Sequence, residues 1–91
     1  MSNFEKIFLD ARDLEHPKPL EIAIKSLREL NKNSYFYMIH RKHPIPLLDL
    51  AQEQGMKVLA KEDSEGNWHI LISRDDSIDL NNLLIDISSD H

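Results

Sequence analysis

Two copies of one short motif place histidine beside proline in this chain. The motif His-Pro-x-Pro-Leu is HPKPL at residues 16–20 and HPIPL at residues 43–47. Imidazole can ligate a metal ion or exchange a proton near neutral pH, and guanidinium and ammonium groups bind anions. The residues of these types in and beside the two motifs form the candidate set: Arg12, His16, His40, Arg41, Lys42 and His43.

One chemistry open to the candidate set is metal or haem binding. Such a site would need two or three imidazoles, from His16, His40 and His43, and a metal would also take a carboxylate. Asp10 and Asp13 are the carboxylates nearest in sequence. No HxxxH or HxH spacing is present, so the pattern indicates a metal only weakly.

Two other interpretations compete with a metal. An anion site would combine N–H groups at the start of a helix with Arg12, Arg41 or Lys42. Alternatively, the side chains are solvated loop residues without a ligand. All three interpretations stay open on the sequence alone.

The prolines and leucines of the repeat have a structural explanation. Proline at the first helical position loses no hydrogen bond, and it pushes the residue before it toward an extended conformation. The leucine then begins a buried stripe. The histidines are not explained in this way, because histidine is a poor N-cap.

Hydrophobic periodicity predicts the elements that position these residues. Strand patterns lie at residues 3–10, 34–40, 56–62 and 68–74, and helical patterns lie at 19–32 and 46–54. The order β-α-β-α-β-β predicts an α/β (α+β) two-layer sandwich, in which a four-stranded mixed sheet carries both helices on one face. The last two strands should form a hairpin. The first two should be parallel, which places His16 and His43 at one sheet edge, where open α/β sheets bind ligands.

Composition argues against several function classes. The chain has no cysteine, which excludes disulfides and thiol chemistry, and its two glycines cannot form a Gly-rich phosphate loop. Ser34 has no neighbouring His-Asp arrangement, and Trp68, Tyr35 and Tyr37 fit sheet packing better than a stacking platform. We therefore expect no enzymatic activity and no resident cofactor.

Charge is distributed unevenly along the chain. Residues 1–74 contain all 11 Lys and Arg and 11 of the 16 Asp and Glu, so residues 75–91 supply the whole net charge of −5. A neutral body with an acidic end is a poor match for nucleic acid or for anionic membrane lipid. No apolar run could cross a bilayer and the start lacks a secretory h-region, so we expect a cytoplasmic protein.

We divide the chain into one domain, residues 1–74, and an acidic C-terminal extension, residues 75–91. Aliphatic side chains of the extension recur at helical spacing, at Leu80, Leu83, Leu84 and Ile87, and Asp79 could cap such a helix. A strand fits the segment LLIDIS as well. The extension could dock on the exposed sheet face, bridge to a partner or to a second copy, or stay mobile, so a homo-oligomer is left open.

The first half of the chain resembles the TusA/SirA-like sulfur-carrier family. Its motif L-D-x-x-G-L-x-C-P-x-P is matched at Leu9, Asp10, Leu14, Pro17 and Pro19. The segment IHRKHPIPLLDLAQEQG and the closing WHILISR are more similar to an uncharacterised bacterial TusA-related group. The resemblance covers residues 5–74 and implies a two-layer sandwich with a four-stranded mixed sheet.

The resemblance also bears on chemistry. His16 stands at the position of the carriers' active cysteine, and imidazole cannot form a persulfide, so the thiol relay does not carry over. Two hypotheses follow. In the first, the protein is a noncatalytic binding or regulatory module that holds a protein partner, small anion or cofactor at the loop edge. In the second, it is an accessory carrier in a redox, sulfur or metal pathway that binds a metal or haem through its histidines.

Overall fold

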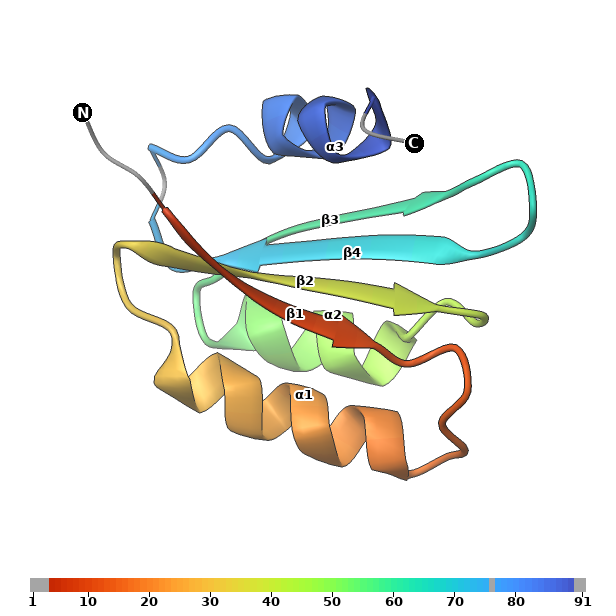
Figure 1. Ribbon diagram of the computed structural model, residues 1–91. Coiled ribbons are helices and arrows are strands. Elements are labelled where there is room, and N and C mark those ends of the chain that lie inside the picture. Colours follow the sequence, from red (N-terminus) through yellow and green to blue (C-terminus); the bar gives the residue numbers. More distant parts are fainter. Residues whose placement is uncertain (1–3, 76, 90–91) are drawn as a thin grey trace.

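The computed structural model describes residues 4–75 and 77–89, the last four of these by their backbone alone. The chain forms one four-stranded sheet, and helices lie on both of its faces (Figure 1). The elements in chain order are β1 (Glu5–Asp10), α1 (Lys18–Glu29), β2 (Ser34–His40), α2 (Ile45–Glu53), β3 (Lys57–Glu62), β4 (Trp68–Ser73) and α3 (Leu80–Ser89).

The sheet has the order β1-β2-β4-β3. β1 and β2 are parallel, with Asp10 opposite Ile39 at the end of the pairing, whereas β4 is antiparallel to both of its neighbours. α1 and α2 lie together on one face (Figure 1). The predicted mixed sheet, its parallel first pair, its closing hairpin and the shared face of the first two helices are all confirmed.

Both proline motifs begin their helices in the same way. The first proline of each motif, Pro17 or Pro44, is the N-cap, and the second, Pro19 or Pro46, is the second helical residue. Each helix therefore starts one residue earlier than predicted, and the expectation of proline at the first helical position was wrong. The physical reason for tolerating proline still holds, because all of the first four N–H groups lack an intrahelical acceptor.

The helix ends also differ slightly from the prediction. α1 ends at Glu29, because the next residue, Leu30, is extended. α2 ends in a Schellman arrangement: the Gly55 N–H donates to the Gln52 carbonyl and the Met56 N–H to the Ala51 carbonyl, each at 3.0 Å. Gly55 has a φ of +79°, so the predicted glycine just beyond this helix is confirmed.

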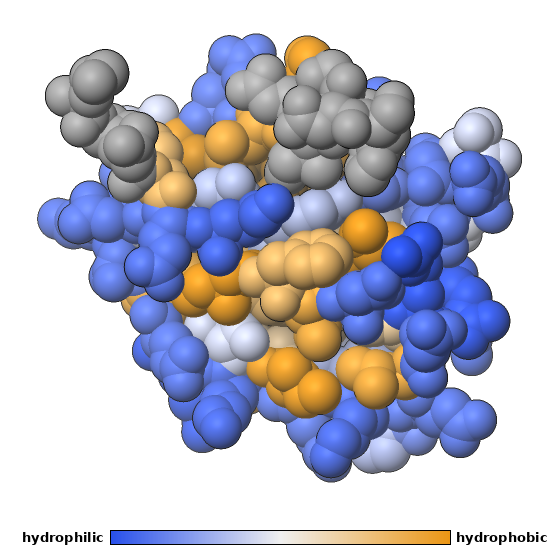
Figure 2. All heavy atoms as spheres, in the orientation of Figure 1, coloured by the Kyte–Doolittle hydropathy of each residue, from blue (hydrophilic) through white to orange (hydrophobic). Residues whose placement is uncertain are grey.

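The main core fills the space between the sheet and the first two helices. On the face shown in Figure 2, hydrophobic side chains gather near the centre and hydrophilic ones surround them. The strands contribute Phe36, Met38, Ile70 and Ile72, and the helices contribute Ala23, Leu27, Leu47 and Ala51. The alternation along residues 68–74 is confirmed, because Ile70 and Ile72 face this core while Leu71 faces the other way.

The C-terminal extension covers part of the opposite sheet face. Ile78, Leu80 and Leu84 are buried against side chains from β2 and β4, namely Tyr35, Tyr37 and Leu71. Asp79 accepts hydrogen bonds from the N–H groups of Asn81 and Asn82 and so caps α3, as the sequence indicated. Of the conformations left open, the structure has the docked helix.

A chain of hydrogen bonds ties the β3–β4 hairpin to β2. The Tyr37 hydroxyl lies 2.7 Å from Nδ1 of His69, and Nε2 of His69 lies 2.8 Å from Oδ2 of Asp63. A neutral imidazole with its proton on Nε2 satisfies both contacts, and its hydrogen bond lowers the pKa of Asp63. Oδ1 of Asp63 in turn accepts the N–H groups of Glu65 and Asn67 at 2.9 Å, which closes the hairpin turn.

We predict that His69→Ala lowers the free energy of unfolding by about 1–3 kcal/mol, because the buried Tyr37 hydroxyl loses its partner. Tyr37 is only 3 % exposed, so water cannot easily replace the imidazole. Urea unfolding followed by circular dichroism measures the loss. His16→Ala is the matched control, since His16 is exposed and its loss should change stability by less than about 0.5 kcal/mol. Equal losses in the two variants would contradict a structural role for the network.

Candidate functional site

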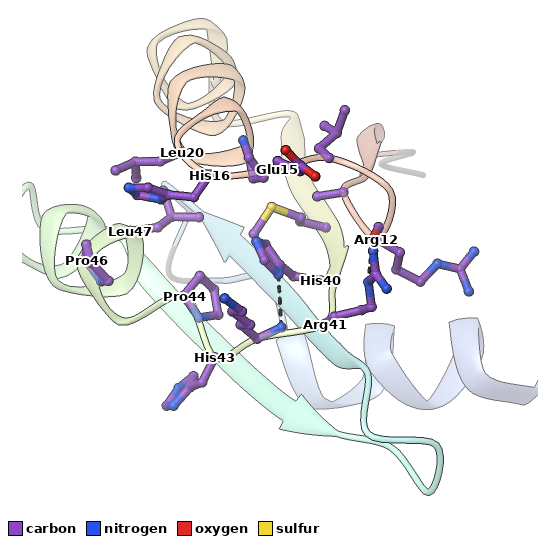
Figure 3. A pocket seen from close by; sticks show the side chains of 15 residues that line it. Arg12, Glu15, His16, Leu20, His40, Arg41, His43, Pro44, Pro46 and Leu47 are labelled. Carbon is purple, nitrogen blue, oxygen red and sulfur yellow. Dashed lines mark hydrogen bonds between the residues drawn. The ribbon is translucent and has the colours of Figure 1, made fainter.

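The loops after β1 and β2 enclose a cavity of about 530 Å³ (Figure 3). Parallel strands end at the same sheet edge, so the chain leaves β1 at Ala11 and β2 at Arg41 side by side before each helix begins. All six residues of the candidate set line the cavity, together with Glu15. One sheet edge therefore brings together residues that lie up to 31 positions apart in the sequence.

The walls of the cavity are apolar. They are formed by Leu14, Pro19, Leu20, Met38, Pro44 and Leu47. Met38 and Leu47 are buried and belong to the main core, so the cavity is a gap in the core that opens at the loop edge. Apolar walls with a few polar groups at the mouth are typical of ligand-binding pockets.

Arg12 is already paired with a neighbour. Its Nε and Nη2 donate to the two carboxylate oxygens of Asp10 at 2.9 and 2.7 Å, and this pairing lowers the pKa of Asp10 to about 2. The Arg12 carbonyl accepts a hydrogen bond from Nε of Arg41, which ties the two loops together. Arg12 thus acts as a loop anchor whose charge is largely balanced by Asp10.

Arg41 and Lys42 carry the unbalanced charge of the site. Among the side chains of residues 4–75 and 77–85, no carboxylate lies within ion-pair distance of Arg41 or Lys42. Both side chains are exposed at the mouth of the cavity. They are the groups that an anionic ligand would meet.

His40 lies between the two loops, where its protonation is unfavourable. The Lys42 backbone N–H donates to its Nδ1 at 3.0 Å, drawn as the dashed line in Figure 3, so Nδ1 cannot carry a proton while this bond exists. Burial, followed by the charges of Lys42 and Arg41, lowers the pKa of His40 below its usual 6.5. At neutral pH His40 is therefore uncharged, with the Nε2 proton as a donor.

We predict that Lys42→Ala raises the pKa of His40 toward its usual value. The change removes the larger of the two charge effects but keeps the burial of His40, which is the main cause, so part of the depression should remain. Because the folded-state pKa lies below the unfolded one, neutral His40 stabilises the fold above pH 6.5, and this contribution is lost as the pH falls through the folded pKa. Histidine NMR titration measures the shift, and Lys61→Ala, on the exposed end of β3, serves as the control. A His40 midpoint at or above 6.5 in the wild-type protein would contradict this assignment.

The three histidines do not converge on one point. The His43 ring stacks on Trp68, with centroids 4.1 Å apart and planes 8° from parallel, and Figure 3 shows it directed away from His40. Across the described residues, no group of three or more His, Cys, Asp or Glu is placed to hold a metal ion. The metal or haem hypothesis gains no support from this geometry. The other two residues considered for a stacking platform, Tyr35 and Tyr37, are buried against Ile78, Leu80 and Leu84 on the opposite face of the sheet, so they offer none.

One known protein family matches most of this chain. The family described as "Uncharacterized conserved protein (DUF2249)" matches residues 8–74, from within β1 to just after β4. The chain belongs to the DUF2249 family. No curated protein and no solved structure matches it. The match does not link DUF2249 specifically to the TusA/SirA carriers, so that part of the sequence interpretation is not established.

The matched range of this DUF2249 domain contains the whole cavity and excludes α3. It also contains cavity residues that sequence reasoning did not select, Glu15 and the apolar walls. Glu15 adjoins the first motif and could have been noticed, whereas Met38 reads simply as an interior strand residue. Where the structure describes the chain, no helix is long and apolar enough to span a membrane.

Proposed function

We propose that this DUF2249 domain is a noncatalytic binding module whose loop-edge cavity holds a ligand with an apolar group and an acidic group. One observation carries the proposal: an apolar cavity of about 530 Å³ opens beside Arg41 and Lys42, which have no carboxylate partner among the described residues. Burial of an apolar group would supply most of the affinity, and the cations would select an acidic one.

The charge balance of the chain strengthens the argument for selectivity. The chain has a net charge of −5, yet the cavity is lined by two cationic side chains without a described carboxylate partner, Arg41 and Lys42, besides the balanced Arg12 and a single carboxylate, Glu15. A local positive potential on an acidic protein attracts anions to this place and not to the surface in general. His40 adds an uncharged N–H donor, which suits an oxyanion without the cost of burying another charge.

The lining also favours binding over covalent catalysis. No Ser, Thr, Tyr or Cys is among the residues that line the cavity, so hydroxyl and thiol nucleophiles are missing from it. The metal or haem alternative has no observation of comparable weight in its favour.

The proposal extends to the relationship suggested by the sequence. We propose that this DUF2249 chain is a bacterial, cytoplasmic member of the TusA-like superfamily, in which the loop edge has kept a binding role without the thiol. The β-α-β-α-β-β order and the position of His16 at the start of α1 support this relationship. The absence of cysteine suits a reducing compartment.

The test compares two probes that share an apolar group, 3-phenylpropanoate and the neutral 3-phenylpropan-1-ol. In ¹⁵N-resolved NMR titrations, the carboxylate should shift the signals of residues 11–20 and 40–47, and the alcohol should shift them much less. His16→Ala should weaken the response to the carboxylate and leave the thermal unfolding midpoint unchanged, because His16 is exposed. Failure of the carboxylate to shift these signals would overturn the proposal.

A further inference from the structure

Ile45 leaves apolar surface exposed next to the cavity. Its side chain is 53 % exposed, and it does not line the cavity. Its neighbours on either side, Pro44 and Pro46, do line it. The apolar surface therefore continues from the cavity onto the first turn of α2, and a small ligand that filled the cavity would leave Ile45 in water.

From this continuity, and resting on the proposed function, we infer that the ligand is a segment of a protein partner. The segment places a large apolar side chain in the cavity and an adjacent Asp or Glu against Arg41 and Lys42, and its backbone crosses over Ile45. Contiguous exposed apolar surface with polar side chains around it marks sites of protein–protein interaction, and here Pro44, Ile45 and Pro46 adjoin the cavity beside Arg41 and Lys42.

The edge of the cavity at residues 43–46 is stiff, which favours recognition of a flexible segment. Pro44 and Pro46 restrict the backbone on both sides of Ile45. His43, two residues before Ile45, is held by its stack on Trp68, so its exposed ring is already ordered before binding. A surface that loses little conformational freedom leaves more of the contact free energy for affinity.

Charge complementarity defines the partner's chemistry. Arg12 is balanced by Asp10, and Arg41 and Lys42 are not balanced by any described carboxylate. The described side chains of α3 do not reach these cations, because α3 packs on the opposite face of the sheet. A carboxylate from another molecule would complement Arg41 and Lys42, and the apolar cavity beside them argues for an acidic peptide over a nucleic acid.

The experiment selects a random 12-residue peptide library against the intact protein and measures the enriched peptides by isothermal titration calorimetry. We expect enriched sequences to carry Asp or Glu within two positions of a large apolar residue. Their affinity should fall at least tenfold on Ile45→Ser and on replacement of the acid by its amide. Ile85→Ser is the matched control, because Ile85 is 63 % exposed but lies on α3, across the sheet, and should leave affinity unchanged.

The other outcomes separate the two proposals. Peptides that bind Ile45→Ser as tightly as wild type would overturn the inference. If no peptide is enriched but 3-phenylpropanoate still shifts the cavity signals, the partner is a small anion, so the inference fails and the proposed function stands. If neither the peptides nor 3-phenylpropanoate binds at the cavity, the inference and the proposed function both fail. Unchanged circular dichroism and unfolding midpoints of Ile45→Ser exclude misfolding as the cause of lost binding.

Discussion

Reversal of both charges in Arg41→Glu/Lys42→Glu should lower the affinity for an acidic ligand by about a hundredfold or more. Each charge-assisted hydrogen bond contributes about 1.5–3 kcal/mol, so the loss of two corresponds to roughly 3 kcal/mol or more, and the new carboxylates add repulsion. Both side chains are exposed, so the fold should persist even though the hydrogen bond from Arg41 to the Arg12 carbonyl is lost, which circular dichroism of the variant checks. Calorimetry with an enriched acidic peptide, or NMR with 3-phenylpropanoate, measures the change.

The matched control separates the local charge of the cavity from the charge of the whole chain. Lys25→Glu/Arg28→Glu alters the net charge by the same amount, but on the exposed surface of α1 away from the cavity. At physiological ionic strength charges more than about 8 Å apart are largely screened, so this variant should bind almost as wild type does. A similar loss in both double variants would show that net charge, and not the rim of the cavity, governs binding.

Arg12 is left out of this reversal for a structural reason. Its guanidinium already forms two hydrogen bonds to Asp10, so its replacement would release a carboxylate next to the cavity as well as remove a cation. The sequence could have suggested this pair, because the two residues are only two positions apart. It could not have shown that Arg41 binds the Arg12 carbonyl and joins the loops.

The sequence located the candidate site because two parallel strands end at one edge. Once residues 3–10 and 34–40 are taken as parallel, the loops that carry His16 and His43 must be neighbours. The orientation of His43 was not predictable in the same way. Trp68 reaches His43 because β4 pairs with β2 so that Trp68 lies opposite His40, and no local pattern reveals the register between strands so far apart in the chain.

Helix boundaries and the extension were harder to predict for a related reason. The start of each motif helix depends on whether the first or the second proline lies in the first turn, and both positions tolerate proline. In the extension, LLIDIS fits a helix or a strand by periodicity. The choice is made by Tyr35, Tyr37 and Leu71, which offer an apolar sheet face to a helical stripe. That face exists only after β2 and β4 have paired.

The two sheet faces therefore have different roles. The inner face, with α1 and α2, builds the core and opens into the cavity, and it lies within the range that matches DUF2249. The outer face is closed in part by α3, which lies outside that range. We therefore expect substitutions in α3 to change stability and substitutions at the loop edge to change binding.

Deletion of residues 75–91 should destabilise the protein to the point that the remaining chain is largely unfolded or self-associates. The deletion removes three buried aliphatic side chains, Ile78, Leu80 and Leu84. At about 1.5–3 kcal/mol for each, the lost burial is about 5–9 kcal/mol as an upper bound, which rivals the 5–15 kcal/mol typical of a whole domain. The deletion also exposes Tyr35, Tyr37 and Leu71, which can then associate between molecules.

Thermal unfolding followed by circular dichroism measures the loss of stability, and light scattering after gel filtration measures self-association. If the shortened chain aggregates, point variants still test the prediction. Leu84→Ala should cost about 2–3 kcal/mol, at the low end for a core leucine, because Leu84 is 7 % exposed. Ile85→Ala, one residue along the same helix and 63 % exposed, should change stability by less than about 0.5 kcal/mol. An unchanged unfolding midpoint after deletion would show instead that residues 1–74 fold as an independent domain and that α3 adds little to the outer face.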